Sequence, residues 1–326
     1  MLPTIRDVAR EAGVSIATVS RVMRDSDTVR PATRARVLLA AQELEYIPSQ
    51  LGRQLAERRH AANGIVFPDL SGPYFAEVVL GYEAVAAELG RSVLILSTNG
   101  RADADVAVRE MAGRCDGLVT LGRTVDDSVI EALAKRGARI VLIARPPIGS
   151  LDSVNAENHD SAVALTEHLI AEGARRLRFV GDPDLTADVA ERWAGVQKAA
   201  DDVELVAVTE LGEDAGTRVA DAALERGDLP DAFVCANDEL ALGVLGRLRA
   251  AGVEVPGQVK VTGWDDVMAA RYAGLTTVRQ PMRELGATAA RMLDELIHDT
   301  RTEPRHELLH TELVIRRSTS RKKESS

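Results

Sequence analysis

The sequence predicts two kinds of fold in one chain: a small all-α helix-turn-helix domain at the N-terminus, followed by a doubly wound α/β domain with two lobes. Residues 4–24 have the pattern of two short helices joined at a glycine. From residue 64 onward, short apolar runs alternate with amphipathic stretches, which is typical of buried parallel strands and the helices that cover them. A chain of 326 residues is also too long for one ordinary core.

The first helix is expected to begin after Thr4, because the side chains of Thr4 and Asp7 can form a variant of the capping box. Gly13 ends it, since glycine adopts a positive φ at little cost where one helix stops and the next starts at a steep angle. Ser15 caps the second helix. That helix has an inward face of Val14, Val19 and Val22 and an outward face of Ile16, Ala17, Ser20 and Arg21.

A helix of this kind can lie in the major groove of DNA with its first residues at the base edges. Ile16 and Ala17 would contact thymine methyl groups, whereas Arg21 can pair with a guanine edge. Phosphate contacts are expected from Thr4, Ser15, Thr18, Ser20, Arg30 and Arg34. Any two amphipathic helices around a glycine share this pattern, so the motif alone leaves a purely structural helix pair open.

The α/β part is predicted from the alternation of apolar runs and amphipathic stretches. Strands are expected at 64–67, 92–96, 117–120, 139–143, 177–180, 203–208, 232–235 and 259–262. Helices are expected at about 74–89, 103–113, 127–136, 159–172, 188–200, 215–226, 238–251 and 283–298. This number of units is too large for one sheet and suits two lobes.

Residues 4–24 resemble the headpiece of the LacI/GalR family of bacterial transcription regulators. A third helix follows at 29–37 with a proline near its first turn, and 44–48 resembles the family's junction into its hinge. Further motifs resemble, in order, the family's two-lobed periplasmic-binding-protein-like (Rossmann-like) sensor: 67–76, 115–118, 192–195, 236–243, 263–266 and 312–318. The resemblance covers nearly the whole chain and implies a DNA-binding repressor controlled by a small effector between the lobes.

The same resemblance implies that Tyr74, Phe75, Arg192 and Asp265 touch the effector. Asn237 is expected there because it follows a strand and precedes a helix, where ligands of α/β lobes bind. Simpler roles remain open, because Asp238 can cap a helix, an arginine on a helix is usually solvated, and the two aromatic side chains can be core. Ala144 replaces an aspartate that family members often carry, and Leu211 stands near the position of a stacking aromatic residue. Both replacements remove contacts that a neutral sugar would use. The expected effector is still a sugar or sugar phosphate, with a nucleoside or another small metabolite as the alternative.

The connecting residues 49–60 resemble the family's hinge helix. Leu55 matches a leucine that wedges into the minor groove, and Leu51 lies one turn before it. A helix of about eight residues is unstable alone in water, and Gly52 weakens it further. We expect the hinge to become helical only when two copies meet on DNA, with the effector biasing that step; a solvated linker is the alternative.

The charge of the chain is uneven. The formal net charge is −10, but residues 1–60 hold ten lysines and arginines against seven acidic residues, and the remainder holds 30 against 43. A small basic head on an acidic body is typical of a DNA-binding module attached to a separate sensor.

The expected domains are a helix-turn-helix domain at 1–48, a hinge at 49–60, an effector and dimerisation domain at 61–318 and a disordered tail at 319–326. A palindromic operator needs a homodimer, expected through helices near 71–89 and 238–251. The tail is too short and polar for a leucine-heptad tetramer.

Other classes of protein are disfavoured. The sequence has no run of eighteen apolar residues and no secretory leader, so we expect a cytoplasmic protein without a membrane span. The motifs of a serine hydrolase, a P-loop and a zinc protease helix are lacking, and the expectation is no enzyme and no cofactor. His306 and His310 have no companion ligands, so no metal site is expected. A transporter's solute-binding protein is opposed by the basic head.

Overall fold

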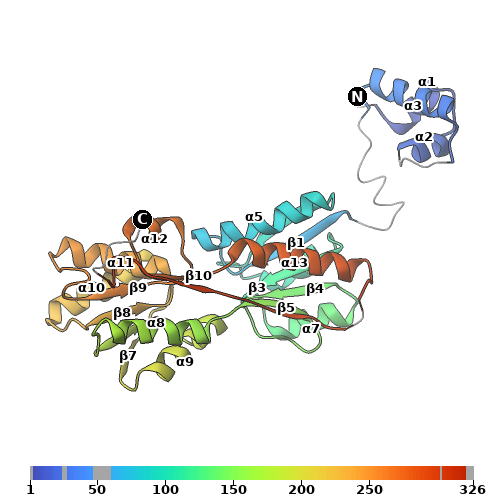
Figure 1. Ribbon diagram of the computed structural model, residues 1–326. Helices are drawn as coiled ribbons and strands as arrows, with labels where there is room; N and C mark the ends of the chain where they lie inside the picture. Colours follow the sequence, from blue (N-terminus) through green and yellow to red (C-terminus); the bar gives the residue numbers. More distant parts are fainter. Residues whose placement is uncertain (1–2, 24–27, 47–59, 302, 321–326) are drawn as a thin grey trace. The chain divides into compact units, whose positions relative to one another are not determined.

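The computed structural model describes residues 3–23, 28–46, 60–301 and 303–320, which divide into two compact units (Figure 1). The first unit, residues 1–61, contains α1 (Ile5–Glu11), α2 (Ile16–Met23) and α3 (Pro31–Glu43). Val8, Val19, Val22 and Val37 form its core with small alanine side chains. The predicted helix pair is therefore present, and the third helix extends six residues beyond its expected end at residue 37.

The second unit, residues 62–326, contains two parallel sheets, one in each lobe. The six-stranded sheet of the first lobe has the order β11-β5-β4-β3-β1-β2. Its strands are β1 (Ala62–Phe67), β2 (Ser92–Ser97), β3 (Gly117–Leu121), β4 (Ile140–Ile143), β5 (Asp152–Ala156) and β11 (His306–Leu309). Its helices are α5 (Pro73–Glu88), α6 (Ala104–Ala112), α7 (Asp127–Lys135) and α13 (Met282–Ile297).

The four-stranded sheet of the second lobe has the order β7-β6-β8-β9. Its strands are β6 (Leu177–Val180), β7 (Val203–Val206), β8 (Ala232–Cys235) and β9 (Lys260–Thr262). Its helices are α8 (His159–Ala171), α9 (Ala187–Ala199), α10 (Glu213–Arg226), α11 (Asp238–Ala250) and α12 (Met268–Ala273). A short antiparallel pair, β10 (Thr277–Arg279) and β12 (Glu312–Val314), completes this unit. The chain thus enters the second lobe after β5, returns with α13 and β11, and leaves again with β12.

Pairs of helices pack closely at positions where a glycine has no side chain to separate them. In the first lobe, a Cβ atom on Gly81 of α5 would lie 1.9 Å from the carbonyl oxygen of Arg283, and one on Gly286 of α13 would lie 2.0 Å from that of Val78. In the second lobe, a Cβ on Gly216 of α10 would lie 2.0 Å from the carbonyl oxygen of Leu240 in α11. These contacts bring each helix pair backbone to backbone and fix its register.

The ordered part of the second unit extends beyond its predicted C-terminal end at residue 318. The disordered tail was expected to begin at residue 319, but Thr319 and Ser320 are buried. The hydroxyl of Thr319 lies 2.7 Å from that of Thr276 and 2.8 Å from Nε2 of His168. These polar contacts hold the chain against the second lobe through residue 320. No helix within the described ranges is long and apolar enough to cross a membrane.

Candidate DNA-reading face and effector site

The two helix starts of the N-terminal unit are built as expected. The backbone N–H of Thr4 donates to Oδ2 of Asp7 at 2.9 Å, and the Thr4 hydroxyl donates to the same oxygen at 2.7 Å. These bonds hold the pKa of Asp7 below its usual value. Oγ of Ser15 accepts from the backbone N–H of Thr18 at 3.1 Å, and Gly13 between the helices has φ of +62°.

The two faces of α2 separate as predicted. Val19 and Val22 are buried, whereas Ile16, Ala17 and Arg21 are exposed, with Ile16 45% exposed. The predicted phosphate contacts lie around this face: Thr4, Ser15 and Arg30 are exposed, and Thr18, Ser20 and Arg34 are half-buried. An exposed isoleucine beside an arginine on a short, well-capped helix suits a surface that is covered when the protein binds its target. The predicted hinge residues Leu51 and Leu55 lie outside the described residues.

Arg192 has the most buried contacts of the predicted effector residues. It lies on α9 and is 5% exposed, although an arginine on a helix is usually solvated. Its Nε donates to Oδ1 of Asn158 at 2.8 Å, its Nη1 donates to the carbonyl oxygen of Ala236 at 2.7 Å, and its guanidinium lies 4.6 Å from the ring centroid of Trp264. The side chain therefore ties together the start of α8, the end of β8 and the loop after β9.

Carboxylates surround this arginine. Oδ2 of Asp188 lies 3.8 Å from Nη2 of Arg192, and buried Asp265 accepts from Nε2 of Gln280 at 2.6 Å. Burial raises the pKa of Asp265 to about 7, helped by the negative charges of Glu239 and Asp188 and opposed by Arg192 and Gln280. Burial also raises the pKa of Asp188. The site holds more acid than base, which favours a ligand that brings hydrogen-bond donors.

Tyr74 belongs to the first lobe, and its hydroxyl lies near the carboxyl groups of Asp188 and Asp265. Its hydroxyl is buried and has no hydrogen-bond partner among the described residues. Burial raises the pKa of this hydroxyl, and the nearby charges of Asp188 and Asp265 raise it further. The ring of Phe75 instead packs edge-on against Phe67, with centroids 5.7 Å apart. Tyr74 and Phe75 both pack against the core of the first lobe, with their ring centroids 5.4 Å apart. Contact of either ring with an effector stays a prediction.

The side chain that caps the start of α11 is Asn237, and not Asp238 as the sequence allowed. Asn237 is the cap: its Oδ1 accepts from the backbone N–H of Leu240 at 3.0 Å, and its Nδ2 donates to the carbonyl oxygen of Leu211 at 2.8 Å. Asp238 is buried and accepts from the N–H of Val267 and the hydroxyl of Thr277. The contact between Asn237 and an effector stays a prediction.

Sequence reasoning missed four residues of this site: Asn158, Asp188, Trp264 and Gln280. Asp188 lies one helical turn before Arg192, so the i, i+4 spacing was a usable signal. Asn158 and Gln280 follow β5 and β10, two short strands that were not predicted. Oε1 of Gln280 is buried without a partner in the described part of the chain, as expected of a group that awaits a ligand or a water molecule.

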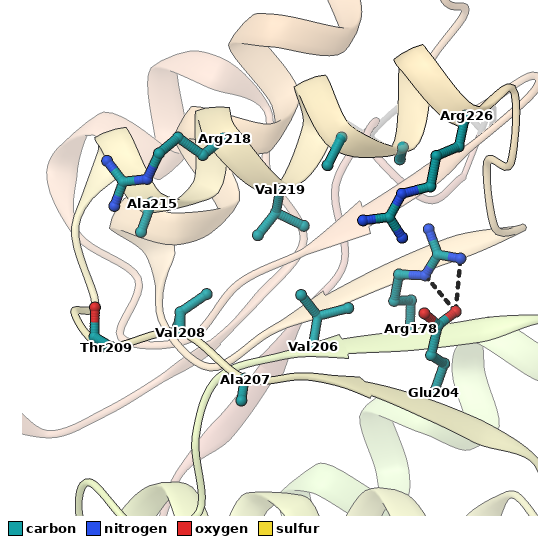
Figure 2. Close-up of a pocket in the computed structure, with 12 residues that line it drawn as sticks. Arg178, Glu204, Val206, Ala207, Val208, Thr209, Ala215, Arg218, Val219 and Arg226 are labelled. Carbon is teal, nitrogen blue, oxygen red and sulfur yellow. Dashed lines mark hydrogen bonds and ion pairs between the residues drawn. The ribbon is translucent and has the colours of Figure 1, made fainter.

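Two cavities lie near these elements. One of about 70 Å³ is lined from both lobes, by Arg123, Ala144 and Arg145 of the first lobe and by Thr186 and Ala187 at the start of α9. The Arg145 guanidinium donates to Asp127 and to the carbonyl oxygen of Gly122, so its charge is largely neutralised. A second cavity, of about 310 Å³, lies under α10 and includes none of the predicted effector residues (Figure 2).

The raised pKa of Asp265 predicts how the free energy of unfolding changes with pH. Its pKa is about 7 in the folded protein and near 3.8 in a free side chain, so the folded protein holds a proton that the unfolded chain loses between these values. The free energy of unfolding should therefore fall as pH rises from about 5 to 7. Asp265→Asn should make this slope shallower, by up to about 1.4 kcal/mol per pH unit, in urea unfolding at several pH values. Equal slopes for the two proteins would contradict the assignment.

Known protein families match each of the two units of the chain. A family model described as bacterial regulatory proteins, lacI family, matches residues 4–49, and a periplasmic binding protein-like domain matches residues 166–319. The transcriptional regulator RegA of Clostridium saccharobutylicum is 32% identical over 335 residues, covering 98% of this chain and 100% of that protein.

Two solved structures match nearly the full chain. The lac repressor dimer bound to operator and the anti-inducer ONPF has a TM-score of 0.89 at 27% identity, covering 98% of this chain and 99% of that one. The complex of the transcriptional regulator CelR with cellobiose has a TM-score of 0.72 at 30% identity, covering 97% and 99%. This chain belongs to the LacI family of bacterial regulatory proteins, which are DNA-binding transcriptional regulators and not enzymes.

Proposed function

We propose that the protein is a homodimeric repressor that binds a palindromic operator and responds to a carbohydrate bound between the lobes of its sensor. The observation that carries the proposal is the outward face of α2, where Ile16, Ala17 and Arg21 are exposed next to the buried valines of the same helix. A bacterial repressor meets its operator in the cytoplasm, so we place the protein there.

The residue types on this face suggest what it reads. Arg21 can donate two parallel hydrogen bonds to a guanine, and the side chains of Ile16 and Ala17 suit thymine methyl groups. Each half-site should therefore contain a guanine flanked by thymine. The hydroxyls of Ser15 and Thr18, which lie 2.9 Å apart at the start of α2, suit phosphate oxygens.

Replacement of Arg21 tests this proposal. Arg21→Ala should weaken binding to the operator by about 1–3 kcal/mol, since a bidentate contact with a guanine is lost. The measurement is fluorescence anisotropy with a palindromic duplex selected from a random pool by the wild-type protein. Arg36→Ala, an exposed arginine on α3, is the matched control. If both variants bind as the wild type does, α2 is not the reading helix.

The charges between the lobes favour a neutral carbohydrate over a sugar phosphate. Arg192 already donates to Asn158 and Ala236, and the carboxyl groups of Asp188 and Asp265 lie near the Tyr74 hydroxyl. A phosphate would add only acceptors and negative charge, whereas sugar hydroxyls supply donors. The CelR–cellobiose complex supports a carbohydrate, although Ala144 lacks the carboxylate that would accept a bond from a sugar hydroxyl.

Exposed apolar side chains support a homodimer. In the first lobe they lie on α5 and on the edge strand β2, at Leu80, Leu94 and Ile95. In the second lobe they lie on α12, where Met268 is 66% exposed and Tyr272 is 78% exposed. Large apolar side chains gathered on exposed elements mark protein contacts. The dimer surface proposed here thus adds β2 and α12 to the helices that the sequence suggested.

A further inference from the structure

The cavity under α10 is a groove between this helix and the edge strand β7, with a volume of about 310 Å³ (Figure 2). The helix faces the strand with short side chains, Ala215, Val219 and Ala222, above a floor of Val206 and Val208. Because these side chains do not fill the space between helix and strand, the groove stays open along β7. Its walls are apolar in the middle, at Val206, Val219 and Ala222, and carry charged side chains around them, among them Glu204 and Arg226.

Three arginines give the groove its charge. Arg178 is buried in the floor, where its Nε donates to Glu204 at 2.6 Å and its Nη2 donates to Asp228 at 2.8 Å. Arg218 pairs with Glu210. Arg226 has no hydrogen-bond or ion-pair partner within the described ranges, and Figure 2 shows its guanidinium reaching down from α10 toward that of Arg178. Two guanidiniums share one end of the groove, and one of them is unpaired.

The position of the unpaired arginine and the volume of the groove indicate which kind of ligand would fit. Arg226 lies eight residues after Arg218, or about 12 Å along α10, so the unpaired charge is at one end of the groove only. A volume of 310 Å³ holds roughly ten water molecules, which is enough for a ligand of about ten heavy atoms. A guanidinium beside an apolar wall recognises an acidic group attached to an apolar body.

We propose that this groove is a second ligand site, separate from the site between the lobes, and that it binds a small organic anion with one acidic group and an apolar body. The acid pairs with Arg226, because Arg178 is already paired with Glu204 and Asp228, and the body lies over Val206, Val219 and Ala222. The carboxylate of the ligand supplies the negative charge that Arg226 lacks. The apolar body removes the exposed alkyl surface of the groove from water.

Calorimetric titration of the full-length protein with sodium octanoate tests the proposal. Octan-1-ol carries the same body without charge, and sodium acetate carries the acid without the body. Octanoate should bind at least tenfold more tightly than either compound. Arg226→Ala should weaken octanoate at least tenfold, and Ala222→Phe should abolish binding by filling the groove. Glu225→Ala, at the neighbouring exposed position on α10, should bind as the wild type does.

Each other outcome overturns the proposal. Equal binding of octanol indicates a purely apolar surface, and equal binding of acetate indicates an adventitious ion only. Octanoate that binds both α10 variants as it binds the wild type lies elsewhere on the protein. No heat of binding with octanoate would exclude this class of ligand. None of these results bears on the operator or on the site between the lobes, because no residue is shared with either.

Discussion

Arg192→Ala should lower the free energy of unfolding by about 3–5 kcal/mol and abolish the response to the effector, because it removes the cation from a buried group of acids. The side chain is 5% exposed and bonds to Asn158 and to the carbonyl oxygen of Ala236. Without it, these acceptors lose their donor, and Asp188 and Asp265 lose the charge that offsets their burial. Urea unfolding and a thermal-shift assay with neutral sugars and their phosphates measure the two effects.

The control for this variant is Arg114→Ala. Arg114 pairs with Glu110 on the surface of the first lobe and is 70% exposed, so its loss should change stability by less than about 1 kcal/mol and leave any sugar response intact. An Arg192→Ala protein as stable as the Arg114→Ala protein would contradict the proposed role in holding the lobe together. A thermal shift produced by a sugar phosphate but not by a neutral sugar would contradict the assigned effector class.

Gly81→Ala should destabilise the first lobe by about 1–3 kcal/mol, near the upper end because the clash is with backbone. The added Cβ would lie 1.9 Å from the carbonyl oxygen of Arg283, and neither α5 nor α13 can yield without losing its packing. Since α5 carries part of the proposed dimer surface, the variant should also dimerise less tightly. Thermal unfolding and analytical ultracentrifugation measure both effects.

A second glycine serves as the matched control. Gly246 lies inside α11 and has open space around it, so Gly246→Ala should stabilise the protein by about 0.5–1 kcal/mol through helix propensity alone. If both alanine variants change stability in the same direction and by the same amount, the close contact of α5 with α13 is not needed for the fold.

Most of the fold could be predicted from the sequence, because its elements have strong local patterns. The eight predicted strands are all present, although β7 ends at Val206, two residues before its predicted end. The missed elements are β5, β10, β11, β12 and α12. They are short, and several carry polar residues, as Asp152–Ala156 does. Their pairing is decided by distant parts of the chain, such as the register of β11 on β5, which no local pattern reveals.

The predicted effector site, like the fold, could be predicted only in part from the sequence. Arg192, Asp265 and Tyr74 stand in recognisable motifs, and the structure brings them together with Asp188. Asn158 and Gln280 have no motif of their own, because their roles depend on contacts across loops that are far apart in the sequence. Trp264 lies in the same motif as Asp265, but its contact with Arg192 cannot be read from that motif. The hinge around Leu51 and Leu55 stays a prediction, and its test must come from DNA binding itself.

Coupling between the sugar and the operator is tested by the affinity of the full-length protein for its operator duplex, measured by fluorescence anisotropy with and without the sugar that gives the largest thermal shift. We expect the sugar to change the affinity of the wild type at least tenfold, a coupling of about 1.4 kcal/mol. The Arg192→Ala protein should bind the operator with an affinity that the sugar does not alter. An operator affinity that is the same with and without the sugar in the wild type, or an equal response in the Arg192→Ala protein, would contradict the coupling of the operator to a sugar site at Arg192.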